Sequence, residues 1–70
     1  MSSFPSTKAK QVLAALVRIG WSVKRQTGSH KVLQREGYDD FVFAFHQNEE
    51  IGSRMLQRIA KKAGLTPDDL

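Results

Sequence analysis

The spacing of apolar residues changes along the chain and predicts a helix near each end, with strands between them. The first helical pattern is carried by Ala9, Val12, Leu13, Leu16 and Val17. Because these residues recur on one helix face, we expect a helix over about residues 7–19. Ser6 or Thr7 is the expected N-cap, and Gly20 is suited to end the helix. Trp21 follows directly and is expected to close the helix end against the core.

A second amphipathic pattern predicts another helix near the end of the chain. Its apolar face carries Met55, Leu56, Ile59 and Ala63. Ser53 is the expected N-cap, and Gly64 followed by Leu65 is typical of a glycine C-cap with its hydrophobic contact. Residues 66–69 then begin a short turn, because a capping threonine precedes a proline and two acidic residues.

Between the helices the apolar period is that of strands. The predicted strands span residues 22–26, 30–35 and 41–46. The third is the clearest, because large aromatic residues alternate with smaller ones. Residues 27–28 predict a turn, residues 36–40 a loop, and residues 47–52 a polar connection interrupted by Ile51. Since the loops are short, the three strands are expected to form an antiparallel meander.

The predicted order of helix, three-stranded antiparallel sheet and helix belongs to the α+β class and is that of a double-stranded-RNA-binding domain. Both helices can cover one face of the sheet and leave the other open. Phe41, Phe43 and Phe45 are predicted to face the helices, because large apolar residues at period two usually form a core face. Stacking of nucleic-acid bases on these rings is the less favoured alternative.

Side-chain alternation then assigns the open face of the sheet. Leu33 is the best core residue of the second strand, which places Lys31 and Arg35 in marginal positions on the covered side. The open face is therefore predicted to carry His30, Val32 and Gln34 from the second strand, and Val42, Ala44 and His46 from the third.

Length and composition narrow the class of protein. Residues 1–70 are expected to form one domain with a thin core. The chain has no cysteine, which excludes disulfides and zinc sites built on thiolates. No apolar run approaches the roughly 20 residues that span a bilayer, and residues 1–5 lack the features of a signal peptide. We therefore expect a cytoplasmic protein without membrane association.

The distribution of charge favours a polyanionic partner. Eleven Lys and Arg oppose seven Asp and Glu, for a formal charge of +4. This charge either serves solubility or attracts nucleic acid. The second helix carries an uninterrupted basic stripe opposite its apolar face, made of Arg54, Arg58, Lys61 and Lys62. Further cations near the first turn between strands are Lys24, Arg25 and Lys31. Such clusters suit phosphate contacts, although a solvated helix face is the alternative.

The two histidines are the candidate catalytic groups. An unperturbed histidine has a pKa of about 6.5, which allows proton transfer near neutral pH. RNA brings its own nucleophile, the 2′-hydroxyl, so its cleavage needs a base, an acid and cations near the phosphate. His30 lies among Lys and Arg and meets these needs, although a lone histidine is more often an ordinary surface residue. No metal-ligand spacing is present, so neither a metal nor another cofactor is predicted.

Gly28-Ser29-His30 resembles a motif of the HicA family of messenger-RNA interferases, and the likeness covers nearly the whole chain. The other similar segments are Gly20-Trp21, residues 25–30, His46 at the end of the third strand, and residues 50–56, 59–61 and 63–65. The tripeptide alone is a weak motif. Its position between these flanks, in a basic chain of this length, makes the combined match specific.

The resemblance implies a double-stranded-RNA-binding-like fold, a toxin that cleaves messenger RNA, and neutralisation by a HicB-type antitoxin. The catalytic histidine of the family corresponds to His30, with Gly28 and Ser29 beside it. His46 is expected to be auxiliary at most, because Ala44 stands where many members carry a proline. Two other functions stay open, namely a non-catalytic RNA-binding module and a protein-interaction domain whose basic stripe meets an acidic partner.

Overall fold

The computed structural model describes residues 4–46 and 48–70. Its elements are β1 (Thr7–Lys8), α1 (Ala9–Arg18), β2 (Ser22–Thr27), β3 (His30–Gln34), β4 (Phe41–Ala44), β5 (Glu50–Ile51), α2 (Ser53–Ala63) and the 3-10 helix η1 (Pro67–Asp69). Residues 1–3, part of the segment that lacks signal-peptide features, lie outside the described residues. So does residue 47, the first of the predicted connection.

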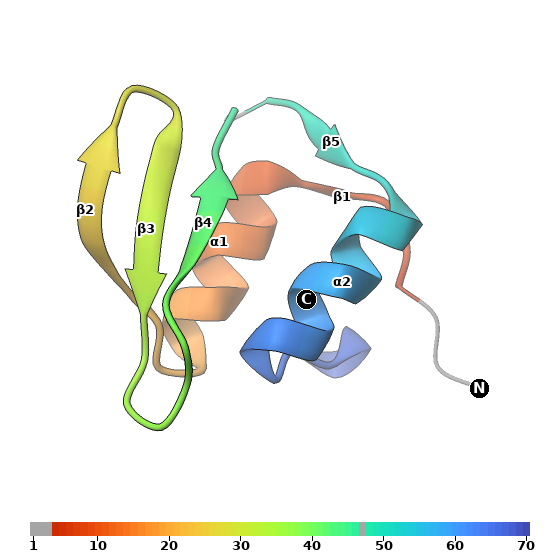
Figure 1. Cartoon of the computed structure of the whole chain (residues 1–70). Helices are drawn as coiled ribbons and strands as arrows, with labels where there is room; N and C mark the ends of the chain where they lie inside the picture. Colours follow the sequence, from red (N-terminus) through yellow and green to blue (C-terminus); the bar gives the residue numbers. More distant parts are fainter. Residues whose placement is uncertain (1–3, 47) are drawn as a thin grey trace.

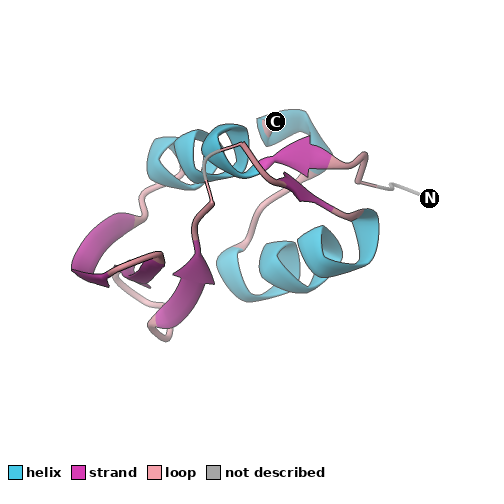
Figure 2. Ribbon diagram, turned by 90° about the horizontal axis from the view of Figure 1, so that it is seen from above, coloured by secondary structure: helices cyan, strands magenta, loops and turns pink. Residues whose placement is uncertain are grey.

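The three predicted strands form an antiparallel sheet in the spatial order β2-β3-β4 (Figure 1). A β-bulge between Val23 and Arg25 interrupts the pairing of β2 with β3, and bulges increase the local twist. In Figure 2 the three-stranded sheet lies to one side of the two helices, so one of its faces is uncovered. The α+β prediction is confirmed, and the architecture is consistent with a double-stranded-RNA-binding-like fold.

The cross-strand pairs confirm the predicted faces of the sheet up to Ala44, because residues opposite each other in an antiparallel pair point to the same side. His46 was predicted on the open face, but it lies beyond the end of β4 and outside the sheet. The pairs on the covered side are Leu33 with Phe41 and Lys31 with Phe43. The pairs on the open side are His30 with Ala44 and Val32 with Val42. Leu33 and Phe43 are buried, while Phe41 and Phe45 are partly buried and pack against the core. The phenylalanines are therefore core residues.

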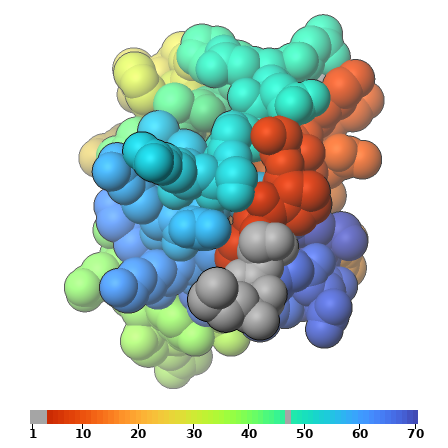
Figure 3. All heavy atoms as spheres, turned by 90° about the vertical axis from the view of Figure 1, so that its right-hand side faces the viewer, coloured from red at the N-terminus to blue at the C-terminus, as the bar shows by residue number. Residues whose placement is uncertain are grey.

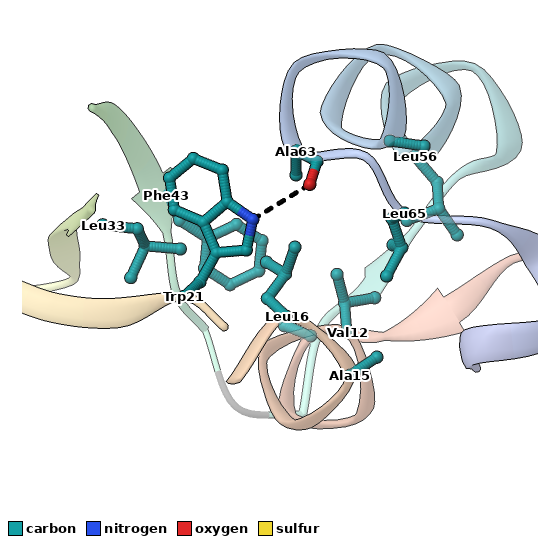
Figure 4. Packing of buried hydrophobic residues seen from close by; sticks show 11 residues of the cluster. Val12, Ala15, Leu16, Trp21, Leu33, Phe43, Leu56, Ala63 and Leu65 are labelled. Carbon is teal, nitrogen blue, oxygen red and sulfur yellow. Dashed lines mark hydrogen bonds between the residues drawn. The ribbon is translucent and has the colours of Figure 1, made fainter. Parts of the chain in front are cut away.

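Trp21 lies at the centre of the core, between the sheet and the two helices (Figure 4). Gly20 turns the chain out of α1 with a φ of +114°, a backbone angle that residues with a side chain rarely adopt. The indole is only 2% exposed, and its N–H donates to the carbonyl of Ala63 at 3.0 Å. The sheet and the helices supply the other large buried side chains, Leu33 and Phe43, Val12 and Leu16, and Leu56.

The first helix starts two residues later than predicted, and neither Ser6 nor Thr7 caps it. Its N-cap is Lys8, without a side-chain cap. The reason is a two-stranded sheet, β1 with β5, that the sequence pattern did not predict. Its pairing continues into the helix, where the N–H of Ala9 donates to the carbonyl of Glu49 at 2.9 Å. The backbone thus supplies an acceptor that a cap would otherwise provide. In Figure 3 the described residues nearest the N-terminus, coloured red, lie between the chain leading into α2 and the C-terminal segment.

Several other element ends also differ from the predictions. α2 begins at Ser53 itself, after the N-cap Gly52, so Ser53 is not the cap. β4 ends at Ala44 rather than at residue 46, because its partner strand β3 begins with His30, opposite Ala44. β3 ends at Gln34, one residue earlier than predicted. The predicted C-cap of the second helix is confirmed, since Gly64 has a left-handed φ of +73°. The predicted turn over residues 66–69 is also confirmed, as a 3-10 helix with a capping box.

Within the described residues, no helix is both long and apolar enough to cross a membrane.

Replacing Trp21 with phenylalanine is expected to lower the free energy of unfolding by about 1–3 kcal/mol. The substitution keeps an aromatic ring but removes the indole donor and part of the buried area. Chemical denaturation measures this loss. Val17→Ala, at an exposed apolar position of α1, is the control and is expected to cost less than about 1 kcal/mol. Equal losses in the two variants would contradict a central role for the indole.

Candidate functional site

His30 is the first residue of β3 and follows a two-residue turn. It pairs with Thr27, so the turn residues are Gly28 and Ser29, one position later than predicted. Gly28 has φ of +57°, and no other residue type has a positive φ in the described chain. A glycine with positive φ at the first central position is typical of a type II′ hairpin turn. This tight turn fixes where β3 starts and therefore places His30.

Contacts from neighbouring strands hold the turn in place. The N–H of Phe45 donates to the carbonyl of Ser29 at 2.6 Å. The Lys31 ammonium donates to the side-chain oxygen of Gln26 at 2.7 Å, and the Gln26 amide donates to the carbonyl of Gly28 at 3.4 Å. Lys31 also lies 5.1 Å from the centre of the Phe45 ring, within range of a cation–π interaction. Lys31 therefore supports the turn from the covered side of the sheet.

The open face around His30 carries one cation of the predicted turn cluster, Arg25, for which residues 4–46 and 48–70 supply no salt bridge. His30 is exposed, and Thr27 lies opposite it. Arg25 is exposed and pairs with Val32, which shares the open side with His30. Lys24, at the bulge, instead forms a salt bridge with Asp40 at 2.9 Å. Of the three predicted cations, Arg25 therefore shares the face of His30, whereas Lys31 lies on the covered side. The charge of Lys24 is offset by Asp40.

The predicted basic stripe of α2 is present, and its four residues Arg54, Arg58, Lys61 and Lys62 are exposed. The salt bridge of Lys24 is the one found among residues 4–46 and 48–70, so these cations have no carboxylate partner there. Lys61 and Lys62 lie in the last turn, where the helix dipole favours positive charge. The stripe is therefore available for anions.

A groove of about 540 Å³ separates β4 from α2, and His46 lies in it. Its β4 wall includes Val42 and Ala44, and its α2 wall includes Arg58 and Lys62. Ala44 is also the cross-strand partner of His30. The structure therefore gathers the predicted residues on two neighbouring surfaces, the open sheet face with His30 and the groove with His46.

Sequence reasoning missed the residues whose role depends on strand register. Gln26 supports the turn through Lys31, and Asp40 pairs with Lys24. Opposite charges and polar partners at positions 24, 26, 31 and 40 were visible in the sequence, but which of them meet depends on the register and on the bulge in β2. No cluster of three or more His, Cys, Asp or Glu side chains suited to a metal occurs in the described part of the chain.

The arrangement is that of a small basic α+β domain of double-stranded-RNA-binding-like architecture, with an exposed histidine and an exposed arginine on the same open sheet face. The model of the family described as HicA toxin of bacterial toxin-antitoxin matches residues 9–65. The chain therefore belongs to the HicA toxin family, which is known for messenger-RNA interferases, and it is a toxin of a toxin–antitoxin system with an antitoxin as its implied partner. No curated protein and no solved structure matches it.

Replacing Gly28 with alanine is expected to lower the free energy of unfolding by about 1–2 kcal/mol, because an alanine strains at positive φ. An added Cβ meets no atom within 4 Å, so the cost is conformational. Gly37→Ala is the matched control, since Gly37 has φ of +86° and equally open surroundings. Both variants should lose similar stability in chemical denaturation.

Only Gly28→Ala is expected to shift the NMR resonances of the His30 ring and of the Phe45 amide, because only this glycine belongs to the turn that places them. Unchanged His30 resonances in Gly28→Ala would contradict the positioning role of the turn.

Proposed function

We propose that this toxin is an endoribonuclease that cleaves messenger RNA without a metal ion, with His30 as its general acid–base residue. The observation that carries the proposal is the exposed position of His30 on the open sheet face, at the start of β3 and on the same side as Arg25. A phosphodiester can approach an imidazole on an uncovered sheet, and the neighbouring guanidinium offers a charge partner for it.

In the proposed reaction His30 takes the proton from the 2′-hydroxyl of the RNA. The 2′-oxygen then forms a bond to the adjacent phosphorus, and the bond from phosphorus to the 5′-oxygen breaks. The leaving 5′-oxygen takes up a proton from water and His30 returns its own proton to the solvent, so the products are a 2′,3′-cyclic phosphate and a 5′-hydroxyl. Arg25 stabilises the charge that builds up on the phosphate oxygens. Because His30 takes up and releases protons, it needs no metal-bound hydroxide.

The remaining predicted site residues have supporting roles in this proposal. Gly28 and Ser29 form the turn that places His30, and Lys31 holds that turn from the other side of the sheet. His46 is auxiliary, because it lies in the groove beyond the end of β4. The α2 stripe binds phosphates along the RNA, and Lys24 contributes less because Asp40 offsets its charge.

His30→Ala is expected to lower the rate of RNA cleavage by at least about 100-fold, the usual contribution of a general acid–base group. The fold should persist, because the side chain is exposed. Cleavage of a labelled RNA measures the rate, and circular dichroism checks the fold. His46→Ala is the matched control and should lose less activity. Cleavage by folded His30→Ala at the wild-type rate would show that the assignment is wrong.

A substrate with a 2′-deoxy residue at the cleavage position is expected to resist cleavage, because it lacks the attacking oxygen. The all-RNA substrate should be cleaved equally well with and without a chelator and should yield a 2′,3′-cyclic phosphate or its 3′-phosphate hydrolysis product. Mass spectrometry of the products measures both points. Cleavage of the deoxy substrate, or complete loss of activity in chelator, is incompatible with this chemistry.

Replacing Arg54 and Lys61 with alanine is expected to weaken binding to all RNA sequences by similar factors. If each contacts one phosphate, the slope of log affinity against log salt should fall by about 1.4 for single-stranded RNA. Binding to a non-cleavable RNA at several salt concentrations measures the slope. The control is the double variant at Lys8 and Lys10, which removes the same charge elsewhere on the surface. Equal slopes in the two double variants would show that the stripe stays in solvent.

A further inference from the structure

The groove between β4 and α2 contains an unpaired sheet edge. In the order β2-β3-β4, the outer edge of β4 has no neighbouring strand among the described residues (Figure 1). The N–H of Phe45 donates to the carbonyl of Ser29 directly opposite it. Since hydrogen-bonded pairs alternate in an antiparallel sheet, Phe43 also bonds toward β3. Val42 and Ala44 therefore direct their backbone N–H and C=O groups outward, on the side of the groove.

These outward groups are not used elsewhere in the described part of the chain. None of the backbone hydrogen bonds formed there outside the regular elements involves Val42 or Ala44. Sheet edges in soluble proteins are usually protected by lysine, proline, a bulge or a covering segment. β4 has the sequence Phe-Val-Phe-Ala and carries neither lysine nor proline. Its edge is therefore suited to pair with another strand.

Both walls of the groove carry apolar side chains. Val42 is 60% exposed on the β4 side, and Met55 is 54% exposed on the α2 side. The partly buried Ile51 and Ile59 also line it. Val42 and Met55 thus offer apolar contacts to a segment that pairs with the free backbone groups of β4. The volume of about 540 Å³ leaves room for the side chains of an added segment.

The charges along the groove have opposite signs at its two ends. Lys62 also lines the neighbouring cavity with Phe41, so the cationic wall lies toward the start of β4. Glu49 and Glu50 line the groove together with His46, beyond the end of β4. RNA carries a negative charge on every nucleotide, and the acidic end would repel it. An extended peptide can place acidic residues beside Arg58 and Lys62 and neutral or basic residues at the other end.

We propose that this groove binds an extended segment of a partner protein, which adds to β4 as a fourth strand. The segment bonds to the backbone of Val42 and Ala44, directs alternate apolar side chains toward Met55, and carries acidic side chains beside Arg58 and Lys62. The proposal goes beyond RNA cleavage and does not depend on it. Because neighbouring strands lie about 4.8 Å apart, the segment would lie about 10 Å from β3, and its protein could extend over the face of His30.

The test uses a displayed library of random twelve-residue peptides, selected against the full chain carrying His30→Ala. Enriched peptides are expected to alternate apolar residues and to concentrate acidic residues at one end. In NMR titrations they should shift the amides of Val42 and Ala44 and slow the exchange of both with solvent by about tenfold or more. Failure to enrich such peptides, or unmoved amides at these two residues, would overturn the proposal.

Paired variants separate the groove from general charge effects. Arg58→Glu is expected to weaken peptide binding about tenfold, the effect of losing about 1.4 kcal/mol. Arg54→Glu makes the same charge change on the same helix outside the groove and should weaken binding less than about twofold, since exposed charges contribute little at a distance. Val42→Pro removes a backbone N–H that points away from β3, so the pairing of β4 with β3 should persist. Peptide binding should weaken, because the added strand loses one hydrogen bond.

Three results would contradict the proposal. Equal effects of Arg58→Glu and Arg54→Glu would show that only net charge matters. A single-stranded RNA that displaces the peptides and slows the exchange of the Val42 and Ala44 amides as they do would assign the groove to RNA. Self-association of the chain in sedimentation, lost in Val42→Pro, would make a second copy the occupant.

Discussion

The hydrogen bond from the Trp21 indole to the carbonyl of Ala63 is the contact on which the rest of the structure depends. It joins the start of β2 to the end of α2, across 42 positions of sequence. The last carbonyls of a helix have no partner within the helix, so a buried helix end needs such a donor. Arg35 adds a second donor to the same oxygen at 3.4 Å.

The Trp21 and Phe41 rings also pack edge to face, with centres 4.8 Å apart. Because these contacts fix the end of α2 against the sheet, the basic stripe and the groove wall lie beside β4.

The small size of the domain explains why one sheet face stays open. A chain of this length buries only about 60% of the surface that it exposes when unfolded, and two helices suffice to cover a single face. The uncovered face carries His30 and Arg25, and the covered face carries the supporting Lys31. His30 and Arg25 are thereby exposed on one side of the sheet, while Lys31 holds the neighbouring turn in place from the other side. A partner that binds only the folded state would add stability to so thin a core.

The fold was largely predictable from sequence, because its main elements are long enough to show a period. The alternation around Phe43 and Leu33 assigned both faces of the sheet, including the open position of His30. The pairing of β1 with β5 was not predictable, because two-residue strands show no period. The candidate site was predictable only in part. Alternation placed Lys31 on the covered side, but its bond to Gln26, which ties it to the turn, depends on the register of β2 against β3. The groove joins Val42 to Met55, which come together only when α2 packs beside β4.

The central claim is that RNA lies on the open sheet face with His30 at its phosphate. The most direct measurement is an NMR titration of the isotope-labelled protein with an RNA oligonucleotide that carries 2′-O-methyl groups throughout and so lacks the attacking hydroxyl. The largest shifts are expected at His30, Arg25 and Thr27, with smaller shifts along the α2 stripe. Shifts confined to α1 or to η1, with the His30 resonances unmoved, would contradict the claim.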